Sequence, residues 1–161
     1  MADLDPVRVA RQVRKLYRLS VPVDPERLAR NLGISVLSAE FSEQLSGVLV
    51  PETYGNETRY LILVNSRHRR TRRRFSIAHE LGHFFLHRGL QPAFTHLGKS
   101  QGRLEREADL FAAELLMPEG DVRLAAQLTN FSGLVRAFEV SAAAMRRRLT
   151  ELGITPKGEI A

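Results

Sequence analysis

The pattern that most restricts the possible folds of this chain is His79-Glu80-Leu81-Gly82-His83, which lies in an apolar stretch with helical spacing. On a helix, residues four apart share one face and stand roughly 6 Å apart along the axis. Two imidazoles can therefore bind one metal ion. Glu80 lies beside them, where it can act on a water molecule without being a ligand. The pattern favours a zinc site that hydrolyses amide bonds.

The same residues also occur by chance, as two solvent-facing histidines next to an acid. Two features argue against that alternative. Gly82 in the middle of a helix costs roughly 1 kcal/mol relative to Ala, and a close approach of backbone or substrate would explain that cost. Apolar residues also surround the motif, and buried histidines need a polar partner. These apolar residues are Phe75, Ile77, Ala78, Leu81 and Phe84.

A third ligand is expected from the segment 103–118, which favours a helix until Pro118 ends it. A catalytic zinc usually takes three protein ligands and leaves one position for water. Glu105 and Glu107 compete for the third position. An apolar stripe flanks Glu105 more closely, and Asp109 shares a face with Glu105. We therefore predict Glu105 as the ligand, Asp109 as the partner of a ligating histidine, and Glu107 as a solvated acid. The stripe consists of Leu104, Ala108, Phe111, Ala112 and Leu115.

Three further histidines need separate interpretations. His87 continues the four-residue ladder, but it would lie about 12 Å from His79 along a straight helix, too far to share one ion. We interpret His87 as a helix-end residue near free carbonyls and the helix dipole. His68 and His96 are interpreted as exposed loop residues. His96, between the two helices, is also a candidate to stabilise an oxyanion.

Length and composition fit one compact domain of a globular protein. The chain has 161 residues, of which 43% are hydrophobic, and no apolar run approaches the roughly 20 residues that span a bilayer. There is no cysteine, hence no disulfide framework and no thiolate ligand. With no signal peptide visible, we expect a cytoplasmic location and no membrane partner. The formal net charge of +6 suits contact with nucleic acid or with an acidic protein.

Much of the positive charge lies in one run, Arg67–Arg74, directly before the histidine motif. Cations at a helix N-terminus oppose the helix dipole by roughly a few tenths of a kcal/mol each, so helix stability does not explain the run. Two interpretations remain open. The run is either a solvated basic surface or a means of recruiting a substrate, or nucleic acid near that substrate, by electrostatic attraction.

Local signals predict helices and strands in the first half of the chain. Residues 6–19 show helical periodicity, and Asp24 caps a second helix that begins at Pro25 and is closed by Gly33. Residues 51–58 have the polar composition of a turn or hairpin loop. Three short strands are expected, the third of them central: Ile34–Leu37, Gly47–Val50 and Tyr60–Val64.

Two long helices and a connecting segment follow the strands. The histidine motif belongs to a helix at about 67–88, and 89–102 is either a plain connector or a lid. Residues 134–154 are typical of helix, short turn and helix, with Ser141 as the cap of the second helix. This resembles a DNA-binding helix-turn-helix. We favour a structural hairpin, because DNA-reading proteins usually need a dimer or more basic surface.

Together these segments resemble the ImmA/IrrE family of metallopeptidases. The strongest matches are Arg74–His87 and Glu105–Pro118, and within the second the ending Phe111–Pro118 is quite specific. The resemblance implies an α+β, zincin-like domain, mostly helical around a small three-stranded sheet. We expect this domain at residues 1–128, with a helix-turn-helix-like hairpin at 129–161 packed on it.

The resemblance also implies a site and a substrate class. Zinc, with manganese as the alternative, would be held by His79, His83 and Glu105, with Glu80 as the general base. The substrate would be a helix-turn-helix transcriptional repressor, cleaved to derepress stress, phage or mobile-element genes. The competing hypothesis is a non-catalytic regulator that binds DNA or a repressor, or a toxin–antitoxin component, with a structural metal. Only three ligands are evident, which favours catalysis, and a nucleic-acid partner is not favoured.

Overall fold

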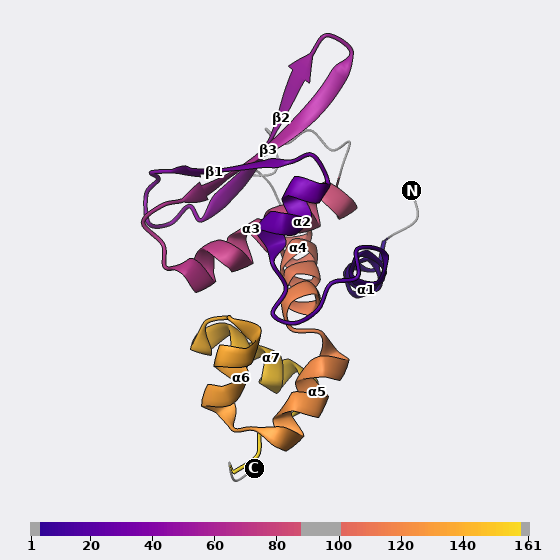
Figure 1. Cartoon of the computed structure of the whole chain (residues 1–161). Helices are drawn as coiled ribbons and strands as arrows, with labels where there is room; N and C mark the ends of the chain where they lie inside the picture. Colours follow the sequence, from indigo (N-terminus) through magenta and orange to yellow (C-terminus); the bar gives the residue numbers. More distant parts are fainter. Residues whose placement is uncertain (1–3, 88–100, 159–161) are drawn as a thin grey trace.

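The computed structural model describes residues 4–87 and 101–158, and within these ranges it has seven helices and one three-stranded sheet. The predicted α+β class is confirmed. Figure 1 shows α5, α6 and α7 as a group at one end of the molecule, with the sheet at the other end. In chain order the elements are α1 (Pro6–Leu16), α2 (Pro25–Asn31), β1 (Ser35–Ala39), β2 (Gly47–Tyr54), β3 (Glu57–Asn65), α3 (Arg70–Leu86), α4 (Gln101–Leu116), α5 (Glu119–Leu128), α6 (Phe131–Phe138) and α7 (Ala142–Leu152).

The first two helices begin as their sequences predict. Asp5 and Asp24 have extended backbones, and each carboxylate accepts hydrogen bonds from two backbone N–H groups of the following turn. Proline is tolerated at the first helical position, because the backbone N–H that it lacks would have no acceptor within the helix there. Gly33, with a φ of +74°, then turns the chain from α2 into β1.

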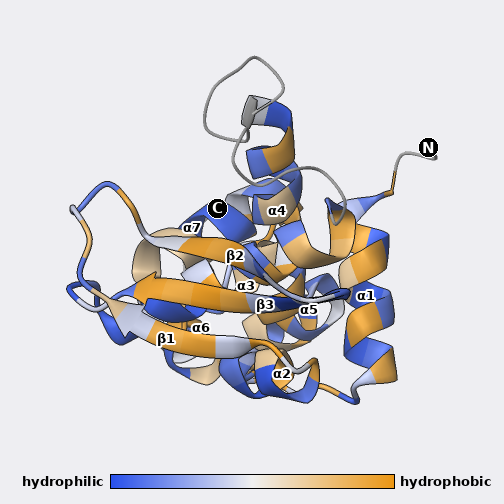
Figure 2. Cartoon of the chain, turned by 90° about the horizontal axis from the view of Figure 1, so that it is seen from above, coloured by the Kyte–Doolittle hydropathy of each residue, from blue (hydrophilic) through white to orange (hydrophobic). Residues whose placement is uncertain are grey.

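β3 is the central strand, as predicted, and β1 and β2 are the edges. β1 runs parallel to β3, with Ser35 opposite Leu61, and β2 runs antiparallel to it, with Gly47 opposite Val64. In Figure 2 the sheet lies across α3 when seen from above.

The prediction of a loop over residues 51–58 is wrong. The two strands extend to Tyr54 and from Glu57, so that only a tight turn at Gly55 separates them. These outer residues are exposed on the hairpin, and backbone pairing forms the strands there without an apolar face. Pro51 is tolerated because β2 is an edge strand.

A glycine sets the close packing of α3 against α4. A Cβ placed on Gly82 would lie 3.0 Å from the Cα of Ala108 and 3.1 Å from its carbonyl oxygen. The backbone approach that would explain a mid-helix glycine is therefore present. Apolar side chains fill the rest of the interior around these helices, among them Leu28, Ile62, Leu81, Phe111 and Leu115, which are all fully buried.

The last two helices, α6 and α7, begin with side-chain caps. Asn130 accepts a hydrogen bond from the Gly133 N–H, and Ser141 accepts one from the Ala144 N–H, which confirms the predicted Ser141 cap. The division after residue 128 stays a prediction. Among the described helices, none combines the length and the apolar character that a bilayer crossing requires.

Candidate metal centre

Three side chains from two helices converge at one point between α3 and α4. His79 and His83 lie one turn apart on α3, and their Nε2 atoms are 3.1 Å apart. Glu105 of α4 places one carboxylate oxygen 3.1 Å from Nε2 of His79 and the other 3.4 Å from Nε2 of His83. One ligand atom from each residue lies within 4.8 Å of the other two, so the group could hold a metal ion. The sequence argument named the same three residues.

Asp109 supports this group from behind. Its Oδ1 lies 2.9 Å from Nδ1 of His79, the ring nitrogen that faces away from Glu105. Glu105 and Asp109 are one turn apart on α4, as the two histidines are on α3. The spacing of four on each helix therefore brings both pairs to one seam.

His83 has a longer chain of support that sequence reasoning missed. Its Nδ1 lies 2.9 Å from Nδ1 of His87, and Nε2 of His87 lies 2.9 Å from a carboxylate oxygen of Glu107. The prediction of Glu107 as a solvated acid is therefore wrong. Its side chain is only 19% exposed, because the end of α3 lies over that face of α4. The available signal was the ladder of histidines at 79, 83 and 87 opposite two acids.

His87 is the C-cap residue of α3, which agrees with its predicted place at the helix end. Its side chain nevertheless turns inward and is buried rather than meeting free carbonyls. Burial lowers the pKa of His87, and Glu107 opposes that effect. The ring is thus favoured in its neutral form, which can donate a hydrogen bond from one nitrogen and accept one at the other.

Glu80 lies beside the three converging side chains and is buried, with 7% of its surface exposed. It approaches the start of the edge strand β2, where a Cβ on Gly47 would lie 3.6 Å from its Oε1. Burial raises the pKa of Glu80, while the charges of His79 and His83 act against the rise. A carboxyl group with a raised pKa exchanges protons more readily near neutral pH.

The charges at the centre favour a bound cation. Burial alone would lower the pKa of His79, but hydrogen bonds with Asp109 and Glu105 raise it to about 10. The same contacts with His79 and His83 hold the pKa of Glu105 far below its usual range. Two imidazoles and a carboxylate are also the donor set of many catalytic zinc sites, so the residues fit a divalent metal.

The two remaining histidines, His68 and His96, are not among the residues that form the candidate metal centre. His68 lies in the loop before α3, as predicted, but it is half-buried, with its Nε2 3.1 Å from the carbonyl oxygen of Glu43. His96, predicted as a candidate for stabilising the transition state, lies outside the described residues.

The arginine run divides into paired and unpaired members. Arg67 forms an ion pair with Glu40. Arg70 and Arg74 both reach the carboxylate of Glu139, at 2.9 and 3.3 Å. Arg70 and Arg74 connect α3 to Glu139, and Arg67 fixes the loop before α3, so neither a purely solvated surface nor a purely recruiting one describes the whole run.

Residues 29–150 match the family model of the IrrE N-terminal-like domain, which is a peptidase family. The match covers well over half of the chain, includes all the residues of the candidate centre, and agrees with the resemblance drawn from the motifs. A search of the curated proteins found no match.

Proposed function

Since this chain belongs to the family of IrrE N-terminal-like peptidase domains, we propose that it is a metal-dependent endopeptidase centred on His79, His83 and Glu105. The observation that carries the proposal is the convergence of these three ligand atoms beside the buried carboxyl group of Glu80. Three protein ligands leave a coordination position for water or substrate, as catalytic sites require.

Glu80 is the general base in this proposal. A divalent ion held by His79, His83 and Glu105, for which we propose zinc, would act as a Lewis acid that polarises the scissile carbonyl and lowers the pKa of water. Glu80 takes the proton of the attacking water and passes it to the leaving amine. Its raised pKa suits both steps, because the group must accept and release a proton within one cycle.

The partners of the two histidines fix their tautomers. When Nε2 of each ring is a ligand, the proton must lie on Nδ1. Nδ1 of His79 then donates to Asp109. Nδ1 of His83 donates to Nδ1 of His87, and Nε2 of His87 donates to Glu107. Both rings are thereby oriented by an acid, one directly and one through a second imidazole.

The substrate is a protein, and β2 offers an edge for it. Glu80 lies near Gly47 at the start of this strand, and one side of β2 is unpaired within the described sheet. An extended substrate segment can add to such an edge through main-chain hydrogen bonds. By the family resemblance, we propose that the substrate is a helix-turn-helix repressor of stress, phage or mobile-element genes, cleaved in the cytoplasm. We keep 1–128 as the proposed peptidase unit and 129–161 as the hairpin.

The competing hypothesis of a DNA-binding regulator gains little from α7. Its three arginines each have a partner in the chain: Arg146 lies over the Phe131 ring, Arg147 pairs with Glu151, and Arg148 pairs with Glu114. Arginines that are engaged in this way are less available for phosphates.

The test compares newly formed protein N-termini in cells that express the wild-type chain or the Glu80→Gln variant. A terminus formed only with the wild type identifies the substrate and the bond. We expect the variant to cleave that substrate at least about 100-fold more slowly with its metal content unchanged. Undiminished cleavage would exclude Glu80 as the base. No difference, at rest and under stress, would favour the binding regulator.

A further inference from the structure

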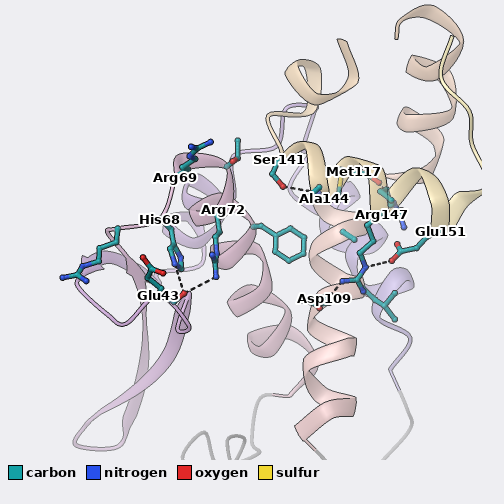
Figure 3. Close-up of a pocket in the computed structure, with 17 residues that line it drawn as sticks. Glu43, His68, Arg69, Arg72, Asp109, Met117, Ser141, Ala144, Arg147 and Glu151 are labelled. Carbon is teal, nitrogen blue, oxygen red and sulfur yellow. Dashed lines mark hydrogen bonds and ion pairs between the residues drawn. The ribbon is translucent and has the colours of Figure 1, made fainter. Parts of the chain in front are cut away.

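A groove of about 670 Å³ lies between α3, α4 and α7 (Figure 3). We propose that it docks an acidic, amphipathic segment of the protein substrate, close to the segment that is cut. This inference rests on the proposed peptidase function and adds the chemical character of the substrate. It depends on three observations: where the groove lies, what forms its floor, and which charges line it.

The groove continues from the candidate metal centre along one seam. On α3, Arg72 and Phe75 line it, and Phe75 lies one turn before His79. On α4, Asp109 lines it and also contacts Nδ1 of His79. Ala113 follows Asp109 by one further turn of the same face. The groove therefore ends at Asp109, directly behind His79, so a segment bound in it lies next to the metal centre.

The floor of the groove is apolar. Phe75 and Ala113 are half-buried in it, and Met117 lies at its base. Leu110 of α4 also lines the groove and is 40% exposed, so its aliphatic side chain is accessible to a partner. Burying such surface under apolar side chains of a partner contributes roughly 25 cal/mol per Å².

Two arginines on the wall of the groove have no carboxylate partner among the described residues. Arg72 donates only to the hydroxyl of Ser46 and the carbonyl oxygen of Glu43. Arg69 is the N-cap residue of α3 and makes no side-chain cap hydrogen bond. Figure 3 shows Arg72 and Arg147 on opposite sides of the groove. Acidic side chains at the edges of a bound segment would complement Arg69 and Arg72.

The same lining argues against nucleic acid as the occupant. A sugar–phosphate backbone gains little from an apolar floor and carries charge at every nucleotide. The groove also contains carboxylates that would repel phosphates, those of Glu43, Asp109 and Glu151. A peptide with spaced acids and apolar residues between them can reach the arginines and avoid these carboxylates.

The test uses fluorescence anisotropy on the full chain carrying Glu80→Gln, so that binding is measured without turnover. The probes are two short labelled peptides with the same apolar pattern, one with glutamates and one with lysines between the apolar residues. We expect the acidic peptide to bind more tightly. Arg69→Glu with Arg72→Glu should weaken that binding at least about tenfold. The matched control, Arg8→Glu with Arg27→Glu, makes the same charge change on exposed residues outside the groove and should not alter it.

A second variant, Leu110→Ser, tests the floor on an exposed residue and should also weaken binding of the acidic peptide. Equal binding of both peptides, or equal losses in the arginine pair and its control, would overturn the proposal. The proposal would also be overturned if the substitutions at Arg69 and Arg72 weakened binding of a labelled DNA duplex but left binding of the acidic peptide unchanged. If the peptide binds as expected but no protein is ever cleaved, the docking site stands and the peptidase proposal fails.

Discussion

One helix, α4, carries two acidic clusters that differ in the kind of cation around them. Near its start, Glu105 faces the imidazoles of His79 and His83. Near its end, Glu114 is 2% exposed and accepts hydrogen bonds from Arg11, at 2.8 Å, and from Arg148.

The difference lies in whether the cation is permanent. Guanidinium groups stay charged in proteins, so the Glu114 cluster balances its charge within the chain. Imidazoles that act as ligands are neutral, so the carboxylates around Glu105 are balanced only when a proton or a metal ion is bound. The first cluster is therefore structural, and the second is suited to binding a cation.

The strongest test of this comparison is Glu114→Ala. It leaves the buried guanidinium of Arg148 without its carboxylate, and breaking a buried ion pair in this way costs about 3–5 kcal/mol. Urea unfolding of the metal-free protein should show that loss, while the metal affinity of the folded variant stays the same. If the free energy of unfolding fell by less than about 1 kcal/mol, the Glu114 cluster would not have the structural role assigned to it.

The matched variant in the other cluster is Glu105→Gln, which keeps the shape and removes the anionic ligand. We expect metal affinity to fall by at least about 100-fold, the upper end of what outer partners contribute. A competition titration with a chelating dye measures it. The free energy of unfolding of the metal-free protein should change less than in Glu114→Ala. Equal destabilisation by both variants would contradict the comparison.

A finer test concerns the support of His83. Replacing His87 by Phe removes the acceptor at Nδ1 of His83, so metal affinity should fall by about 10- to 100-fold. In His87→Asn, the side-chain carbonyl oxygen can accept the same hydrogen bond, so this variant should recover part of the lost metal affinity. His68→Phe is the control outside the centre. An unchanged affinity in His87→Phe would show that the chain through Glu107 does not orient the ligand.

The last test, whose expected effect is the smallest when counted per pH unit, is the pH dependence of metal binding. Because the pKa of His79 is raised to about 10, a metal ion must displace a proton, and its apparent affinity should fall about tenfold per pH unit between pH 9 and 7. In the metal-free protein, the raised pKa adds stability that is complete below about pH 6.5 and disappears as the pH rises through about 10. Isothermal titration at several pH values, with unfolding curves of the chelator-treated protein, checks both signs.

Local sequence signals predicted much of this molecule. The caps at Asp24 and Ser141 and the spacing of His79 and His83 act within one or two turns of chain. Family resemblance and helix-face arguments both pointed to Glu105, which the structure brings to the two histidines.

The errors arose where a distant segment decides the outcome. The hairpin beyond Pro51 is polar, and only pairing with the opposite strand makes it β-structure. Glutamate is usually a surface residue, and Glu107 is shielded from solvent only because His87, at the end of α3, packs against it. Neither position is encoded in the spacing of neighbouring residues.

The contact of Gly82 with the backbone of Ala108 has a consequence for the choice of ion. Two proposed ligands lie on α3 and one on α4, so the separation of the helix axes sets how large an ion fits between them. Zinc bonds to nitrogen and oxygen at about 2.0–2.2 Å, and calcium needs about 2.3–2.6 Å. A methyl group at position 82 would meet Ala108 at 3.0 Å and push the helices apart. In a metal-loaded protein, Gly82 would therefore contribute to selecting the ion by its radius, although Gly82 lies outside the proposed ligand set.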